Sequence, residues 1–298
     1  MKYYIGIDGG GTKTEFVLTD ERGNVLSRVL KTGSNPNDIG MENSYIVLSN
    51  GLKELLQGAM LNLNDLFIFA GIAGTGVGET AKILQEKLSV EYPHVQVASD
   101  LMNALEVCLQ GEDGLAVICG TGLSCCICEN SETRIVGGYG YLFEDGGSGY
   151  AYGRDAVNAA LKYEDGIGEK TVLLKYLQTY FSKTVRASLG ELLTKGKFFV
   201  ASFCPIVFQG YAAGDAVCKK IVENNLQSTV WLVKNALALS KQKKKKLSFI
   251  GGVSKEPLFQ ERMRKEFDDC EVLFCAEKPV WGAVRLAIQR GEKWLYNV

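Results

Sequence analysis

The chain has 298 residues, of which 46% are hydrophobic and 22% are charged, and its formal net charge is −1. This composition is typical of a globular protein with one large domain or two ordinary ones. The near-neutral charge excludes the electrostatic pattern of a protein that binds nucleic acid or an anionic membrane.

The N-terminal segment reaches an acid, Asp8, without the apolar run of a signal peptide. The apolar stretch that starts at Leu66 is interrupted by glycines and is too short to span a bilayer. We therefore expect a cytoplasmic protein whose nine cysteines are reduced thiols. The group formed by Cys125, Cys126 and Cys128 lies in an apolar strand pattern, which favours buried thiols over the alternative of a metal or cluster site.

Strands and helices alternate along the first part of the chain. Apolar runs predict strands at 3–8, 14–19 and 25–33, then a helix at 42–59. A strand at 63–74, a helix at 78–88, a strand at 95–100 and a helix at 101–110 follow. Alternating strands and helices indicate an α/β fold.

The opening pattern then recurs at 114–138, as strand, Gly-Thr turn, strand, polar turn and strand. Gly11 and Gly120 are 109 positions apart, and so are Asp20 and Glu129. Two features with one spacing predict an internal duplication, with a chance likeness of two hairpins as the alternative. The rest is mostly helical over 155–240, with strands at 247–252 and 271–276 and a last helix from 281.

Both Gly-Thr turns suit the binding of an anion. Glycines let the backbone N–H groups approach a ligand closely, and consecutive N–H groups in a turn form an anion nest. The first turn is not a P-loop, because a strand pattern follows it where a P-loop would open a helix. Asp8 precedes the first turn, where its carboxylate would repel a phosphate unless a cation such as water-bound Mg²⁺ lay between them. A simple capping role in the turn is the alternative for Asp8.

Three glycine motifs and one longer segment carry a resemblance to a known family. Asp-Gly-Gly-Gly-Thr at 8–12, Gly-Thr-Gly at 120–122 and Gly-Gly-Val at 251–253 resemble the phosphate-1, phosphate-2 and adenosine motifs of the actin-like ATPase and sugar kinase superfamily. The segment at 137–156 is similar to that of N-acetylglucosamine kinases within the BadF/BadG/BcrA/BcrD ATPase family. The resemblance covers nearly the whole chain.

This resemblance implies a two-lobed actin-like ATPase (ribonuclease H-like) fold, built from duplicated βββαβαβα units with the nucleotide in the interlobe cleft. The N-terminal lobe is expected over 1–106, completed by a C-terminal helix at 285–298, and the C-terminal lobe over 107–284. The nucleotide is expected to be ATP, with Mg²⁺ held by Asp8. The residues expected to bind ATP are Gly10, Gly11, Thr12, Lys13, Gly120, Thr121, Gly122, Gly251, Gly252 and Val253. A tight strand–helix turn is the alternative for 251–253.

By the same resemblance, Asp100 occupies the position of the family's catalytic base, which accepts the proton of the sugar hydroxyl. A plain helix cap is the alternative for Asp100, and an ordinary turn is the alternative for Asn35. The residues expected to bind the sugar are Asn35, Gly71, Ala73, Gly74, Asp100, Gly138, Tyr139 and Asp145. Tyr139 stands where the family has Trp, and Glu144 stands where it often has Gly, which leaves the identity of the sugar open.

The expected activity is an ATP-dependent transfer of phosphate to the 6-hydroxyl of an amino sugar, with N-acetylglucosamine as the first candidate. Glucosamine or N-acetylmuramic acid are the alternatives within the class. An ATP-dependent activator of a 2-hydroxyacyl-CoA dehydratase or benzoyl-CoA reductase is the alternative outside it, since such relatives use cysteines to hold an iron–sulfur cluster. The expected partners are the amino sugar, ATP and a second copy of the chain in a homodimer, with neither nucleic acid nor membrane among them.

Overall fold

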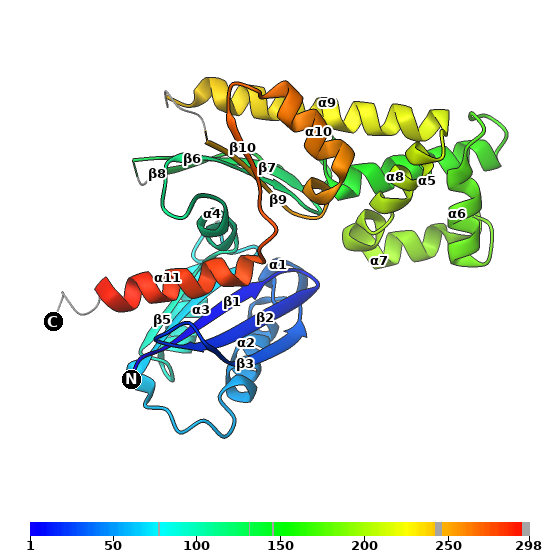
Figure 1. Ribbon diagram of the computed structural model, residues 1–298. Coiled ribbons are helices and arrows are strands. Elements are labelled where there is room, and N and C mark those ends of the chain that lie inside the picture. Colours follow the sequence, from blue (N-terminus) through cyan, green and yellow to red (C-terminus); the bar gives the residue numbers. More distant parts are fainter. Residues whose placement is uncertain (77, 131, 145, 242–245, 294–298) are drawn as a thin grey trace. The chain divides into compact units, whose positions relative to one another are not determined.

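The computed structural model describes residues 1–298 with the exception of 77, 131, 145, 242–245 and 294–298 (Figure 1). The chain forms two compact units. Unit 1 comprises Met1–Gly111 and Glu277–Val298, and unit 2 comprises Glu112–Ala276. The end of the C-terminal helix expected at 285–298 lies outside the described residues.

Unit 1 contains a five-stranded sheet in the order β3-β2-β1-β4-β5. Its strands are β1 (Tyr3–Gly9), β2 (Lys13–Asp20), β3 (Val25–Thr32), β4 (Leu66–Ile72) and β5 (His94–Ser99). Its helices are α1 (Pro36–Ile39), α2 (Met41–Leu55), η1 (Leu63–Asp65), α3 (Thr80–Ser89), α4 (Leu101–Leu109) and α11 (Pro279–Lys293).

The parallel strands of unit 1 bring three segments to one edge of the sheet. β1 pairs in parallel with β4, and β4 pairs in parallel with β5, whereas β1 and β2 form an antiparallel hairpin. Asp8 lies opposite Gly71, and Ile72 lies opposite Ser99. The carboxyl ends of β1, β4 and β5 therefore meet, which is the edge where open α/β sheets bind ligands.

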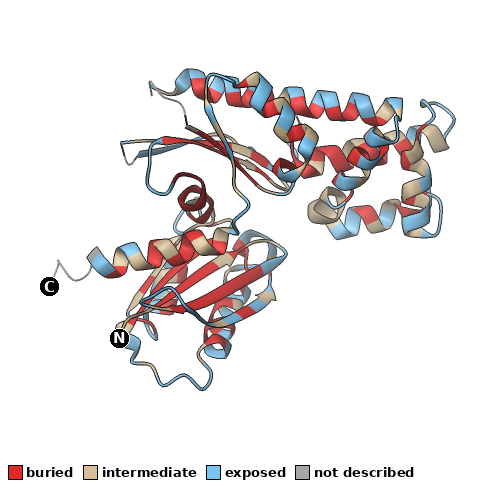
Figure 2. Cartoon of the chain, in the orientation of Figure 1, coloured by how far each residue is buried: buried red, intermediate tan, exposed pale blue. Residues whose placement is uncertain are grey.

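Both faces of this sheet are covered by helices. On one face, apolar residues of β1, β2 and β4 pack with Leu48 and Leu52 of α2 and with Leu84 of α3. On the other face, Tyr4 and Phe69 pack against α11. The last helix of the chain thus belongs to the first unit, where it also contacts α4 (Figure 1). Figure 2 shows the buried residues running through the strands and along the inner faces of the helices.

Unit 2 contains a second five-stranded sheet, in the order β10-β9-β6-β7-β8. Its strands are β6 (Gly114–Cys119), β7 (Leu123–Glu129), β8 (Glu132–Gly137), β9 (Lys246–Ile250) and β10 (Glu271–Phe274). Its helices are α5 (Gly149–Glu164), α6 (Val172–Phe181), η2 (Arg186–Ser188), α7 (Leu189–Ala201), α8 (Cys204–Ala212), α9 (Ala216–Leu239), η3 (Val253–Lys255) and α10 (Pro257–Glu266).

The two sheets share one topology, which confirms the α/β class and the duplication predicted from the 109-residue spacing. In each, an antiparallel three-stranded meander leads into two parallel strands. The repeats differ at the turn itself. Gly9 pairs with Thr14 across the first turn and Cys119 pairs with Leu123 across the second, so the second turn is one residue shorter.

The nine cysteines, all among the described residues, are thiols and form no disulfide bonds in the structure. Cys125 and Cys126 lie fully buried in β7, and burial raises the pKa of Cys125 to about 12. Among the described residues, no three His, Cys, Asp or Glu side chains are grouped as ligands for a metal ion. Among the described helices, none is both long and apolar enough to cross a membrane.

Candidate active site

The first Gly-Thr turn joins β1 to β2 and packs against Gly33 and Ser34, which follow β3. The N–H of Gly10 donates to the carbonyl of Lys13 at 2.9 Å, and the N–H of Ser34 donates to the carbonyl of Gly10 at 3.0 Å. A Cβ at Gly33 would lie 2.1 Å from the carbonyl oxygen of Gly11, so glycine is required there for close packing. The turn is therefore fixed, while Thr12 and Lys13 remain exposed.

The second turn, in unit 2, has the same character. The N–H of Gly120 donates to the carbonyl of Gly122 at 3.0 Å, and the carbonyl of Gly120 accepts the N–H of Gly149 at the start of α5 at 2.8 Å. Gly251 abuts this turn, since a Cβ there would lie 2.3 Å from the carbonyl oxygen of Cys119. Its φ of +124° also disfavours any other residue. Val253 is buried in the core of unit 2, so its backbone is the part available to a ligand.

Asp8 is the last but one residue of β1 and is half-buried. Its Oδ1 accepts a hydrogen bond from Nδ2 of Asn103 at 2.9 Å. Burial raises the pKa of Asp8 to about 6; the charges of Asp100 and Glu15 raise it as well, whereas the bond from Asn103 lowers it. Asp8 and Asp100 thus place two carboxylates at the strand ends of unit 1, which is a setting that favours a bound cation.

Asn103 was not expected among the site residues, yet it connects three of the elements around Asp8. Its side chain is fully buried, and Nδ2 also donates to the carbonyl of Ile7 at 3.1 Å. A Cβ at Gly71 would lie 2.3 Å from Oδ1 of Asn103, and a Cβ at Gly282 of α11 would lie 2.0 Å from its carbonyl oxygen. Glycines at both positions therefore make room for Asn103, which in turn fixes the Asp8 carboxylate.

Asp100 follows β5 and occupies the N-cap position of α4, but its side chain makes no capping hydrogen bond there. Its Oδ1 accepts the hydroxyl of Ser99 at 3.3 Å. Burial raises the pKa of the Asp100 carboxyl, and the hydrogen bond with Ser99 offsets part of this effect. A partly buried carboxylate with a raised pKa is a better proton acceptor than a fully exposed one.

Asn35 caps α1 with its side chain, since Oδ1 accepts the N–H of Asn37 at 3.0 Å. Nδ2 of Asn35 donates to Oδ2 of Asp38 at 2.8 Å. A Cβ at Gly74 would lie 2.1 Å from Oδ1 of Asn35, and Gly74 has a φ of +80°. Asn35 therefore both caps α1 and packs against the glycine loop at 71–76, which lies at the end of β4.

The glycine loop after β4 connects this asparagine to Asp100. The N–H of Ala73 donates to the carbonyl of Gly9 at 2.7 Å, and the buried Thr75 hydroxyl donates to the carbonyl of Ile72 at 2.8 Å. A Cβ at Gly76 would lie 3.5 Å from Oγ of Ser99. Unit 1 thus brings together the expected residues Asp8, Asn35, Gly71, Ala73, Gly74 and Asp100.

In unit 2, Gly138 packs tightly against β7, whereas Tyr139 is 72% exposed. Asp145 lies outside the described residues. Glu144 does not point into open space: its Oε2 accepts the N–H of Leu123 at 3.2 Å, next to the second turn. The side chain expected to adjoin the sugar therefore contacts the phosphate-2 motif.

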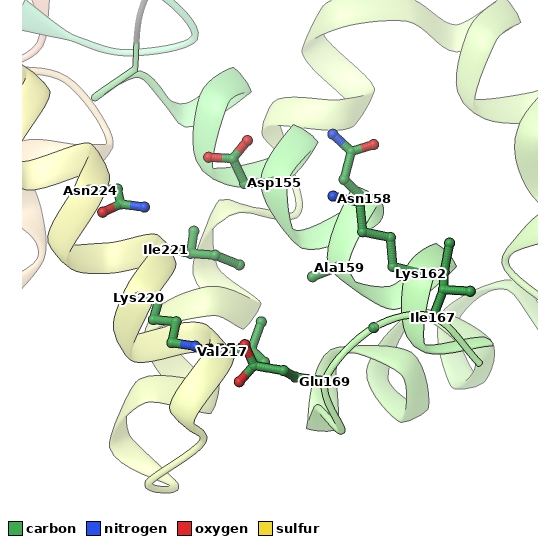
Figure 3. Close-up of a pocket in the computed structure, with 11 residues that line it drawn as sticks. Asp155, Asn158, Ala159, Lys162, Ile167, Glu169, Val217, Lys220, Ile221 and Asn224 are labelled. Atoms are coloured by element: carbon green, nitrogen blue, oxygen red, sulfur yellow. Dashed lines mark hydrogen bonds and ion pairs between the residues drawn. The ribbon is translucent and has the colours of Figure 1, made fainter. Parts of the chain in front are cut away.

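A separate cavity of about 510 Å³ lies between α5 and α9 (Figure 3). Its lining combines polar side chains, most of them exposed, with the apolar side chains of Ala159, Val217 and Ile221. Lys220 and Glu169 form an ion pair of 2.6 Å at its rim. None of the residues expected to bind ATP or sugar lines this cavity.

Comparison with known proteins places the chain in a family. The model of the BadF/BadG/BcrA/BcrD ATPase family matches residues 5–272. The chain belongs to this family, as its motifs had indicated. A solved structure from Chromobacterium violaceum, provisionally named an N-acetylglucosamine kinase, shares the fold with a TM-score of 0.78 at 22% identity, over 96% of this chain and 99% of that one.

Two curated relatives are similar over most of their length. The N-acetylmuramic acid/N-acetylglucosamine kinase of Clostridium acetobutylicum is 34% identical over 85% of this chain and 86% of its own length. The N-acetyl-D-glucosamine kinase of Dictyostelium discoideum is 28% identical over 96% of this chain and 97% of its own length.

Proposed function

We propose that this protein is an ATP-dependent kinase that transfers the γ-phosphate of ATP to the 6-hydroxyl of an amino sugar, with N-acetylglucosamine as the substrate. The observation that carries the proposal is the placement of two carboxylates, Asp8 and Asp100, at the edge where β1, β4 and β5 end. The names of the two relatives support a sugar kinase with this substrate.

Asp100 is assigned as the general base. The sugar hydroxyl must lose its proton as it attacks the γ-phosphorus, and a positioned carboxylate can accept it. Asp100 suits this role because its carboxylate is not used to cap α4 and because burial raises its pKa. The hydroxyl of Ser99 donates to Oδ1 of Asp100 and so orients the carboxylate.

The glycine loop and Asn35 are assigned to the sugar. Asn35 has a buried amide, which can donate to and accept from sugar hydroxyls. Gly71 and Gly74 let Asn103 and Asn35 approach the backbone after β4. Ala73 adds only a methyl group, which leaves room for a sugar ring and its N-acyl group. Gly138, Tyr139 and Asp145 are assigned to the sugar on the likeness of their segment alone.

The two Gly-Thr turns are assigned to the phosphates of ATP. Four backbone N–H groups of the turns donate to no backbone carbonyl among the described residues: those of Gly11, Thr12, Thr121 and Gly122. Thr12 adds an exposed hydroxyl. Such groups bind phosphate without a rearrangement of the backbone. Lys13 supplies a positive charge beside the first turn. Gly251, Gly252 and the backbone of Val253 are assigned to the adenosine.

The residues of unit 1 also fit a magnesium ion. Mg²⁺ prefers carboxylate oxygens and keeps several water molecules, so one or two carboxylates are enough. Asp8 provides such an oxygen, fixed by Asn103, and the nearby charge of Asp100 adds to the attraction for a cation. When bound, Mg²⁺ neutralises charge on the phosphates.

The function is tested by supplying Mg-ATP with a panel of sugars and measuring ADP release. N-acetylglucosamine should stimulate ADP release most, with N-acetylmuramic acid and glucosamine as the competing substrates. If no sugar stimulates ADP release above the background rate, the kinase proposal is wrong. If N-acetylmuramic acid alone stimulates ADP release, the protein is a sugar kinase but its substrate is N-acetylmuramic acid instead of N-acetylglucosamine.

A further inference from the structure

Glu144 lies against the second Gly-Thr turn. Its Oε2 accepts the N–H of Leu123 at 3.2 Å, and its other carboxylate oxygen accepts the hydroxyl of Ser148. A Cβ at Gly122 would be 3.8 Å from Oε2 of Glu144. The carboxylate therefore sits beside the last residue of the turn and binds the N–H that directly follows it.

The segment that carries Glu144 is anchored to unit 2. Oγ of Ser148 accepts the N–H of Ala151 at 3.1 Å and so caps α5. The N–H of Gly147 donates to Oδ1 of Asn225 at 2.8 Å, and this asparagine of α9 is 2% exposed. These bonds fix Gly147 and Ser148, and the Ser148 hydroxyl in turn binds the Glu144 carboxylate. The carboxylate is therefore held in place.

The charge of Glu144 is compensated only in part. Burial raises the pKa of its carboxyl, whereas the Ser148 and Leu123 hydrogen bonds and the charge of Arg154 lower it in part. Arg154 is itself paired with Asp155 at 3.0 Å. A phosphate group in the adjacent turn would thus meet a like charge at short range, and like charges in such contact reduce affinity.

We propose that Glu144 lowers the affinity of the 120–122 turn for a nucleoside triphosphate, because its carboxylate occupies the N–H of Leu123 directly after the turn, where it competes with a phosphate oxygen, and places a negative charge beside Gly122. A phosphate that binds the N–H groups of Thr121 and Gly122 meets this charge at short range. This inference rests on the assignment of the turn to ATP. It differs from the sequence-based expectation, which connected Glu144 with the choice of sugar.

The variant Glu144→Gln separates charge from shape. Glutamine has the size of glutamate and can still accept the N–H of Leu123, but it carries no negative charge. Binding of ATP is measured by calorimetry in the full-length protein, with thermal melting as the check that each variant folds. Glu144→Gln should bind ATP about tenfold more tightly than the parent protein, and Glu144→Ala at least as tightly as Glu144→Gln.

Glu261→Gln, an exposed carboxylate on α10, is the matched control and should leave ATP affinity unchanged. Because the effect is electrostatic, the gain from Glu144→Gln should shrink when the salt concentration is raised. Equal or weaker binding by Glu144→Gln overturns the competition. If neither the parent nor the variant binds ATP, then the assignment of the turn to ATP fails, and the inference about Glu144 fails with it.

Discussion

Nδ2 of Asn103 donates to Oδ1 of Asp8 at 2.9 Å, from a side chain that is fully buried between the backbone of Gly71 and the end of β1. This bond sets the position of the Asp8 carboxylate and also its acidity, because a donor to a carboxylate lowers its pKa. Asn103 is therefore a positioning residue for the magnesium side of the proposed site.

Replacement of Asn103 by Ala should shift the pH dependence of the reaction. Without the hydrogen bond, the pKa of Asp8 rises above its value of about 6. As the pH is lowered, the Asp8 carboxylate therefore becomes protonated at a higher pH than in the parent protein. We expect the acid limb of the kcat/KM profile to move upward, with a larger loss of rate at pH 6.5 than at pH 8.5. The variant should also be less stable, by about 1–3 kcal/mol. Asn224→Ala, an exposed amide on α9, should show neither change.

Replacement of Asp8 by Asn should raise stability while it lowers activity. The pKa of Asp8 is raised from 3.8 to about 6 in the folded protein. The native state therefore binds more protons than the unfolded state between these values, and stability falls as the pH rises through this window. In the absence of Mg²⁺, Asp8→Asn should be more stable at pH 8 by up to about 3 kcal/mol, and this gain should disappear towards pH 4.

The comparison is made by denaturant unfolding at both pH values. Glu86→Gln, an exposed carboxylate on α3, is the control for the loss of one negative charge. A variant Asp8→Asn that is less stable than the parent at pH 8 would show that the carboxylate is not destabilised by its surroundings.

Gly74→Ala should weaken the binding of the sugar selectively. A Cβ there would lie 2.1 Å from Oδ1 of Asn35, and the φ of +80° adds backbone strain. We expect the KM for the sugar to rise at least about tenfold, while the KM for ATP changes less than twofold. Gly23→Ala has a φ of +81° and open space around the site of substitution, so it controls for strain alone. A parallel loss of affinity for both substrates would contradict the assignment.

Gly251→Ala should have the opposite selectivity. A Cβ there would lie 2.3 Å from the carbonyl oxygen of Cys119 and 2.9 Å from the nitrogen of Gly120, so the second turn must shift. We expect the KM for ATP to rise at least about tenfold, with little change in the KM for the sugar. Gly214→Ala, with a φ of +85° in open space, is the control. An unchanged KM for ATP would exclude this turn from the nucleotide site.

Local patterns in the sequence predicted the strands of both sheets and the duplication of the unit that contains them. The shared spacing of the Gly-Thr turns and of the polar turns at Asp20 and Glu129 was sufficient to indicate two copies of one unit. The periodicity of the last helix gave no information about its partner. α11 packs on β1 and α4 of unit 1, at the opposite end of the chain, because its apolar face matches that sheet.

The site was predictable where a residue stands at a strand end. Asp8 and Gly71 lie next to the carboxyl ends of β1 and β4, and Asp100 directly follows β5, so their proximity follows from the parallel pairing of these strands. Asn103 was not predictable, because in the sequence it is one polar residue in an apolar helix and its partner is 95 positions away. The two glycines that make room for it, Gly71 and Gly282, are the signal that points to a buried contact.

The orientation of Glu144 was also beyond the sequence. Its neighbours in the chain indicate a glycine-rich loop, but the direction of the side chain depends on the N–H of Leu123 and on Ser148. Positive φ angles at Gly146 and Gly147 turn the chain back toward α5. The sequence pattern does not specify whether the Glu144 side chain approaches the expected sugar site or the turn at 120–122.

Single-turnover transfer from γ-labelled ATP to N-acetylglucosamine measures directly whether Asp100 removes the proton from the sugar hydroxyl. Asp100→Asn keeps the size of the side chain but removes the base. We expect this variant to bind ATP normally and to transfer the label about 10²–10⁴ times more slowly than the parent protein. Transfer by Asp100→Asn at a rate close to that of the parent would show that Asp100 is not the base.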